Sequence, residues 1–94
     1  MKLTFPLAIK ITIDERSKDA PFIAYAPELD IASCGKTEKK ARQNLIEAIS
    51  ITLDEIDKKG KLEEFLQEIG FYRTKRGFRP PRMTFESFSY QASS

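Results

Sequence analysis

The stretch FIAYAPELDIASCGKTEKKARQNLIEAI (residues 22–49) decides the fold, because it changes from a strand pattern to a helix pattern within a few residues. Residues 22–26 alternate between two faces, as strands do, and Pro27 is expected to end them. Residues 30–35 predict a second, short strand that Gly35 closes. Thr37 then stands where a helix N-cap is expected, and from Ala41 onward apolar residues recur at three- and four-residue steps.

The segments on either side complete the expected architecture. Residues 7–13 alternate and predict a first strand, and residues 61–70 predict a short amphipathic helix that ends at Gly70. The links between the three strands are too short for a crossover helix, so the strands are expected to be antiparallel. We predict an α+β fold, with an antiparallel three- to four-stranded sheet packed by one long helix and a short second helix.

The same patterns predict the core. One face of the first strand carries three isoleucines, and one stripe of the long helix is apolar; these are Ile9, Ile11 and Ile13, and Ala41, Leu45, Ile49 and Leu53. The single cysteine, Cys34, falls within a predicted strand, and we expect it to be a small buried apolar residue rather than a reactive thiol.

Charge is distributed unevenly along the 94 residues. The first 72 residues hold 11 basic and 13 acidic side chains, whereas residues 73–82 hold five basic side chains and no acidic one. We therefore divide the chain into an α+β domain (residues 1–72) and a basic segment followed by a C-terminal strand or arm (residues 73–94). One cysteine and no membrane-length apolar run favour a cytoplasmic protein that does not contact membranes.

Several kinds of chemistry lack the residues that they need. The chain has no histidine, one cysteine and no glycine-rich phosphate-binding motif, which argues against a metal site, a cofactor and histidine-based catalysis. Asp14, Glu28 and Asp30 fall near strand ends, where two-metal nucleases place their carboxylates. A solvated surface produces such a distribution by chance, however. We expect a binding protein without catalytic activity.

An ordered set of residues surrounds Pro-Glu-Leu-Asp, a glycine, a threonine and a helix with Asn-Leu-x-Glu-Ala; its members are Tyr25, Pro27, Glu28, Leu29, Asp30, Ala32, Ser33, Gly35, Thr37, Ala41, Asn44, Leu45, Glu47 and Ala48. Through this set, residues 7–58 resemble the HicB family of bacterial and archaeal antitoxins. Lys39 and Lys40 depart from it, because the family usually carries acidic residues there. The DNA-binding module that many members append is also not visible.

The resemblance implies a partial ribonuclease-H-like fold and an antitoxin that neutralises a HicA-like toxin, which is a small RNA-cleaving protein. Glu28 and Asp30, with Tyr25 beside them, are the expected toxin-binding residues, since carboxylates on a turn complement a basic RNA-binding face. An architectural role for the two acids is an equally good interpretation, and Pro27, Gly35 and Thr37 are expected to be architectural.

The basic segment has its own candidate function. Its cations alternate with Tyr72 and Phe78, a composition suited to phosphates and stacked bases; they are Arg73, Lys75, Arg76, Arg79 and Arg82. A solvated flexible linker, or a clamp on an acidic patch of the partner, explains the composition as well. The alternative function for the whole chain is therefore a transcriptional regulator that binds operator DNA through this segment.

Residues 83–90 alternate apolar and polar side chains, which is compatible with a final strand, an arm that reaches a second subunit, or a partly ordered tail. A small sheet leaves its edges unpaired, and the last 23 residues are rich in aromatic side chains. Both features favour a homodimer to which the tail contributes.

Overall fold

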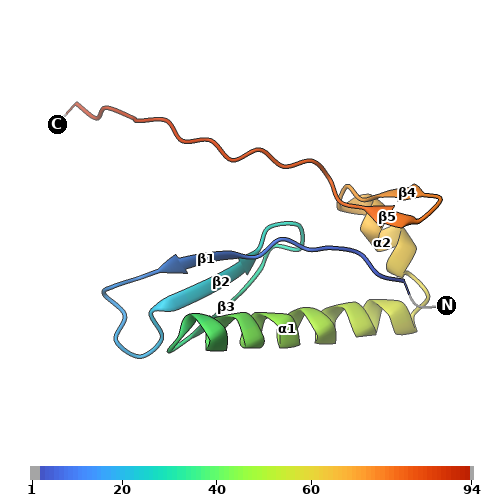
Figure 1. Ribbon diagram of the computed structural model, residues 1–94, viewed down its shortest axis with the longest axis horizontal. Coiled ribbons are helices and arrows are strands. Elements are labelled where there is room, and N and C mark those ends of the chain that lie inside the picture. The colour runs from blue at the N-terminus through green and yellow to red at the C-terminus, as the bar shows by residue number, and fades with distance from the viewer. Residues whose placement is uncertain (1–2, 94) are drawn as a thin grey trace.

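The computed structural model describes residues 3–93 and confirms the α+β prediction. Strands β1 (Lys10–Ile13), β2 (Phe22–Ala26) and β3 (Ile31–Gly35) form an antiparallel sheet in the order β1-β2-β3. Helix α1 (Glu38–Lys58) runs along one face of this sheet (Figure 1). Helix α2 (Leu62–Glu68) follows, and a separate antiparallel hairpin is made by β4 (Tyr72–Thr74) and β5 (Gly77–Arg79).

The first core lies between the sheet and α1. Ala24 and Ala26 of β2 are fully buried against Ala41 and Leu45 of α1, and Ile49 of α1 completes this cluster. Small residues on the strand let the helix approach closely. The start of α1 is fixed by Thr37, whose hydroxyl accepts a hydrogen bond from the Lys40 backbone N–H at 3.0 Å, so the predicted N-cap is confirmed.

Two expectations about burial in the sheet are wrong. Ile11 packs against the first core, but Ile9 and Ile13 are 36% and 60% exposed, because α1 contacts β3 and β2 and does not extend over β1. Cys34 is exposed rather than buried. It pairs with Ile23, which places it on the sheet face opposite the one that carries Ala24 and α1.

A second core holds α2 and the hairpin together. Leu66, Phe71 and Phe78 are buried in it, and Phe5 packs edge-on against Phe71 with ring centroids 5.6 Å apart. The β4–β5 hairpin crosses the expected boundary at residues 72 and 73, so the basic segment is part of a packed unit as far as Phe78. Gly70 lies at φ +99°, a conformation that favours glycine and turns the chain out of α2.

Beyond β5 the chain becomes an extended arm. Residues 80–93 form no strand, and the arm projects away from the body (Figure 1). The radius of gyration is 16.3 Å, whereas a compact chain of 100 residues has about 13 Å. Residues 82–93 therefore add to the length of the molecule and not to its core. Within residues 3–93, no helix is long and apolar enough to cross a membrane.

Candidate functional site

The β2–β3 turn carries the first candidate surface. The Tyr25 hydroxyl donates a hydrogen bond of 2.7 Å to the Asp30 carboxylate, which is exposed. Asp30 lies at φ 54°, in the left-handed region that aspartate tolerates better than most residues. The hydrogen bond to Asp30 raises the pKa of Tyr25, and desolvation and the negative charge of Asp30 act in the same direction. Tyr25 and Asp30 thus form a fixed aromatic–carboxylate pair at the surface.

Glu28, the third expected toxin-binding residue, has a different role in the fold. Its two carboxylate oxygens accept hydrogen bonds from the Ala8 backbone N–H at 2.9 and 3.2 Å. This contact holds the segment before β1 against the β2–β3 turn, and the Glu28 side chain is half-buried there. Of the three expected residues, Asp30 is exposed and Tyr25 is half-buried beside it, whereas Glu28 anchors the segment before β1.

The three acids considered for a nuclease-like site do not converge. Asp14 follows β1 and is bonded to Arg16, near the β1–β2 loop, whereas Glu28 and Asp30 lie in the turn at the other end of β2. Across the described part of the chain, no group of three or more acidic or cysteine side chains is placed to hold a metal ion.

Other residues of the ordered set are scaffolding. Gly35 is buried, and a Cβ built on it would lie 2.5 Å from the Ala41 backbone nitrogen, so glycine is needed there for the close approach of α1. The Asn44 amide donates a hydrogen bond of 2.9 Å to the Cys34 carbonyl and links α1 to β3. This contact was not anticipated, because no local pattern in the sequence joins positions 34 and 44.

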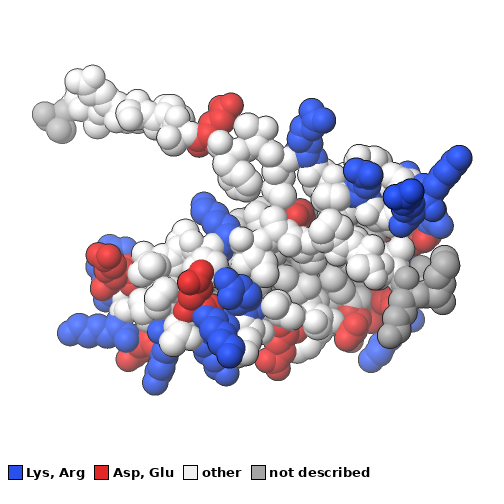
Figure 2. Space-filling model, in the orientation of Figure 1, with Lys and Arg blue, Asp and Glu red and all other residues white. Residues whose placement is uncertain are grey.

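Four of the five cations of the basic segment lie on the β4–β5 hairpin, where Figure 2 shows basic side chains gathered, and Arg82 follows in the arm. Arg73 is already engaged, since it forms an ion pair with Glu63 of α2 and its guanidinium lies 5.6 Å from the centroid of the Phe78 ring. The remaining four cations are exposed and have no ion pair among the described residues; they are Lys75, Arg76, Arg79 and Arg82. The segment is therefore a structured basic hairpin rather than a flexible linker over residues 72–79.

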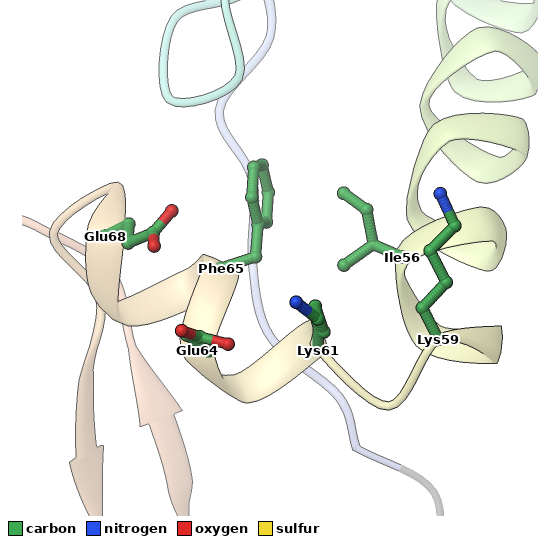
Figure 3. Close-up of a pocket in the computed structure, with 6 residues that line it drawn as sticks. All are labelled: Ile56, Lys59, Lys61, Glu64, Phe65 and Glu68. Atoms are coloured by element: carbon green, nitrogen blue, oxygen red, sulfur yellow. The ribbon is translucent and has the colours of Figure 1, made fainter.

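One hollow adjoins the β4–β5 hairpin, and another lies between α1 and α2. The first, of about 410 Å³, lies between residues 3–4, Glu63 and residues 73–77, so its wall includes the basic turn of the hairpin. The second, of about 220 Å³, separates the end of α1 from α2, where Ile56 and Phe65 face each other (Figure 3). The charged residues around the second hollow balance, and they are Lys59, Lys61, Glu64 and Glu68. It is best described as an incompletely filled contact between the two helices.

Comparison of the chain with models of protein families, with curated proteins and with solved structures yields no significant match.

Proposed function

We propose that this chain is a cytoplasmic antitoxin of HicB type, which binds and neutralises a HicA-like RNA-cleaving toxin without catalysing a reaction itself. One observation carries the proposal. Among the residues of the HicB-like set, Gly35, Thr37 and Asn44 have structural partners, whereas the Tyr25–Asp30 pair faces outward. A residue pair that lies at the surface and does not hold other elements of the fold together is available to a partner.

The surroundings of this pair suit a protein partner. The sheet face opposite α1 carries the exposed small residues Ala32 and Cys34, and no helix within residues 3–93 covers it. A flat face of this kind admits close contact. The Asp30 carboxylate, fixed by Tyr25, would meet the basic surface with which an RNA-cleaving protein holds its substrate, and such complementarity favours both rate and specificity of association.

The test begins with the gene that adjoins the one encoding this chain. We expect it to encode a small basic protein that arrests growth and cleaves RNA, and we expect co-expression of this chain to relieve the arrest. Asp30→Asn removes one charge and keeps a residue that tolerates the left-handed conformation. It should weaken binding at least about fivefold in calorimetry, or roughly 1 kcal/mol.

Glu15→Gln is the matched control. It also removes one exposed negative charge, but from the β1–β2 loop at the other end of the sheet, so its affinity should equal that of the parent. A neighbouring protein that neither binds this chain nor cleaves RNA would refute the proposal. Equal weakening by Asp30→Asn and Glu15→Gln would refute the assigned surface.

The basic hairpin supports a second candidate, an operator-binding regulator. Four exposed cations, interrupted by no acid between residues 73 and 82, would contact phosphates and give salt-dependent binding. We would expect the logarithm of the affinity to fall with the logarithm of salt concentration with a slope of about −3 to −4 per chain. Arg76→Ala should make the slope shallower by about 1. Lys18→Ala, outside the hairpin, should leave it unchanged.

A further inference from the structure

The arm is fixed at its base and free beyond it. Pro80 and Pro81 are half-buried, and Pro81 lies against Gly70. A hollow of about 240 Å³, lined on this side by Pro80, Pro81 and Met83, separates the base of the arm from residues 6–8 and Glu28. From residue 82 to residue 93 every side chain is exposed, and no hydrogen bond within residues 3–93 involves residues 80–93. Phe85, Phe88 and Tyr90 are 72%, 89% and 81% exposed. Such a concentration of exposed aromatic surface is characteristic of a segment that binds something.

The outer edge of β1 is also unpaired. Antiparallel strands direct the backbone groups of alternate residues toward the same neighbour. The Asp14 N–H donates to the Pro21 carbonyl at 2.7 Å, and the Ala8 N–H donates to Glu28, so the even-numbered residues point toward β2 and the β2–β3 turn. The N–H and C=O groups of Ile9, Ile11 and Ile13 must then point outward, where no further strand of the described part of the chain pairs with β1.

The opposite edge of the sheet is partly covered. The outward carbonyl of Cys34 on β3 accepts the hydrogen bond from Asn44, and α1 lies over β3. Among residues 3–93, no helix lies beside β1, and Ile13 is left 60% exposed. Proteins usually cover or pair a hydrophobic edge, because an open one recruits other strands. Of the two edges of the three-stranded sheet, that of β1 is the more open to an added strand.

We propose that the arm of a second copy of this chain adds to β1 as an antiparallel fourth strand, and that the two copies exchange arms across a two-fold axis. Within one chain, the arm and β1 run in the same general direction (Figure 1). A two-fold axis perpendicular to that direction reverses the partner's arm, so it meets β1 antiparallel. Strand addition of this kind satisfies backbone groups and places alternate side chains against the recipient.

One alignment of the partner's arm with β1 gives favourable cross-strand neighbours on both faces of the sheet. With Phe85 opposite Ile11, Met83 lies opposite Ile13 on the α1 face of the sheet, and the exposed isoleucine gains an apolar neighbour. On the other face, Glu86 lies opposite Lys10, and Thr84 opposite Thr12. Opposite charges, paired threonines and paired apolar side chains are all favourable cross-strand neighbours. Beyond Arg82, the arm carries one charged side chain, that of Glu86, which Figure 2 shows as an acidic group on an otherwise uncharged segment.

The register can be tested in the full-length chain by disulfide formation. Thr12 and Thr84 would form a non-hydrogen-bonded pair with Cα atoms about 4.5 Å apart, which a disulfide can bridge. Cys34→Ser removes the native thiol, and Thr12→Cys with Thr84→Cys should then give a covalent dimer on mild oxidation, linked between positions 12 and 84. Thr12→Cys with Ser87→Cys is the control, since those positions would lie three residues out of register on opposite faces.

Sedimentation and a charge exchange complete the test. The Cys34→Ser chain should sediment as a dimer, Lys10→Glu and Glu86→Lys should each weaken the dimer at least about twofold, and their combination should restore it. A monomer, or a 12–84 disulfide within a single chain, would overturn arm exchange. A dimer that forms no 12–84 link would place the interface elsewhere and would overturn it too. These outcomes do not depend on whether a toxin is bound.

Discussion

At the scale of single residues, Gly35 shows how one missing side chain sets a packing distance. Its φ is not in the left-handed region, so conformational freedom is not the reason for glycine. An added Cβ would lie 2.5 Å from the nitrogen and 3.0 Å from the Cα of Ala41, and backbone atoms of a helix cannot turn aside. Gly35→Ala should therefore reduce the free energy of unfolding by about 1–3 kcal/mol in urea denaturation.

Lys36→Ala provides the control for this change, because it is exposed and directly follows Gly35. Its effect should stay within about 0.5 kcal/mol, as is usual at surface positions. If Gly35→Ala proved as mild as Lys36→Ala, the close approach of α1 to β3 would be wrong.

The Tyr25–Asp30 pair predicts a pH effect. The raised pKa of Tyr25 means that the folded protein holds the phenol proton more tightly than the unfolded chain does. The resulting stabilisation is fully present below the unfolded pKa, and it is lost as pH rises through the folded pKa of Tyr25. Asp30→Asn removes the negative charge, so the NMR titration midpoint of the Tyr25 ring should fall. Tyr72 and Tyr90 serve as internal references, and an unchanged Tyr25 midpoint would argue against the pair.

At the scale of elements, α1 has one face that tolerates charge and one that does not. Leu45 is fully buried in the first core, whereas Ile51 of the same helix is 62% exposed. Leu45→Asp places an unpaired charge in the core and should reduce the free energy of unfolding by at least about 2 kcal/mol. Ile51→Asp also replaces an aliphatic residue of α1 by aspartate, so the change in helix propensity is similar. It should reduce the free energy of unfolding by less than about 1 kcal/mol. Equal costs in urea denaturation would contradict the assigned core face.

The elements were predictable from sequence to the extent that each depends on local signals. The period of α1, the Thr37 cap and Gly70 at the end of α2 are all local signals, and the alternation in residues 22–35 correctly predicts two strands. How far α1 reaches across the sheet depends on tertiary packing, which is why Ile9 and Ile13 were wrongly assigned to the core. The face occupied by Cys34 depends on the hairpin register, which the flanking residues did not specify.

The candidate surfaces, too, were predictable from sequence only in part. The acids and cations were visible as residue types, but their present partners were not. Glu28 binds the backbone of Ala8, twenty positions earlier, and Arg73 pairs with Glu63 in α2. These contacts arise when separate elements meet, so spacing along the chain does not reveal them. The consequence is practical, because Glu28 and Arg73 are poor choices for testing partner binding.

At the scale of the whole molecule, the segment before β1 joins the two cores. Leu3 and Phe5 pack against the second core, and Leu7 packs against both. The hydrogen bonds from Ala8 to Glu28 then hold this segment beside the sheet. Because Leu7 contacts the two apolar clusters at once, it should couple the stability of α2 and the hairpin to that of the sheet.

Leu7→Ala tests this coupling by hydrogen exchange. Loss of a half-buried leucine should cost about 1–3 kcal/mol, which is less than a fully buried one would cost. Since about 1.4 kcal/mol corresponds to a tenfold change in an opening equilibrium, exchange should accelerate roughly five- to hundredfold in α2 and in β2–β3 alike. Phe5→Ala, which affects the second core only, should accelerate exchange in α2 and the hairpin while β2–β3 keeps its protection. If Leu7→Ala changed exchange in only one of the two regions, the cores would be independent, and the segment before β1 would be a tether rather than a shared packing element.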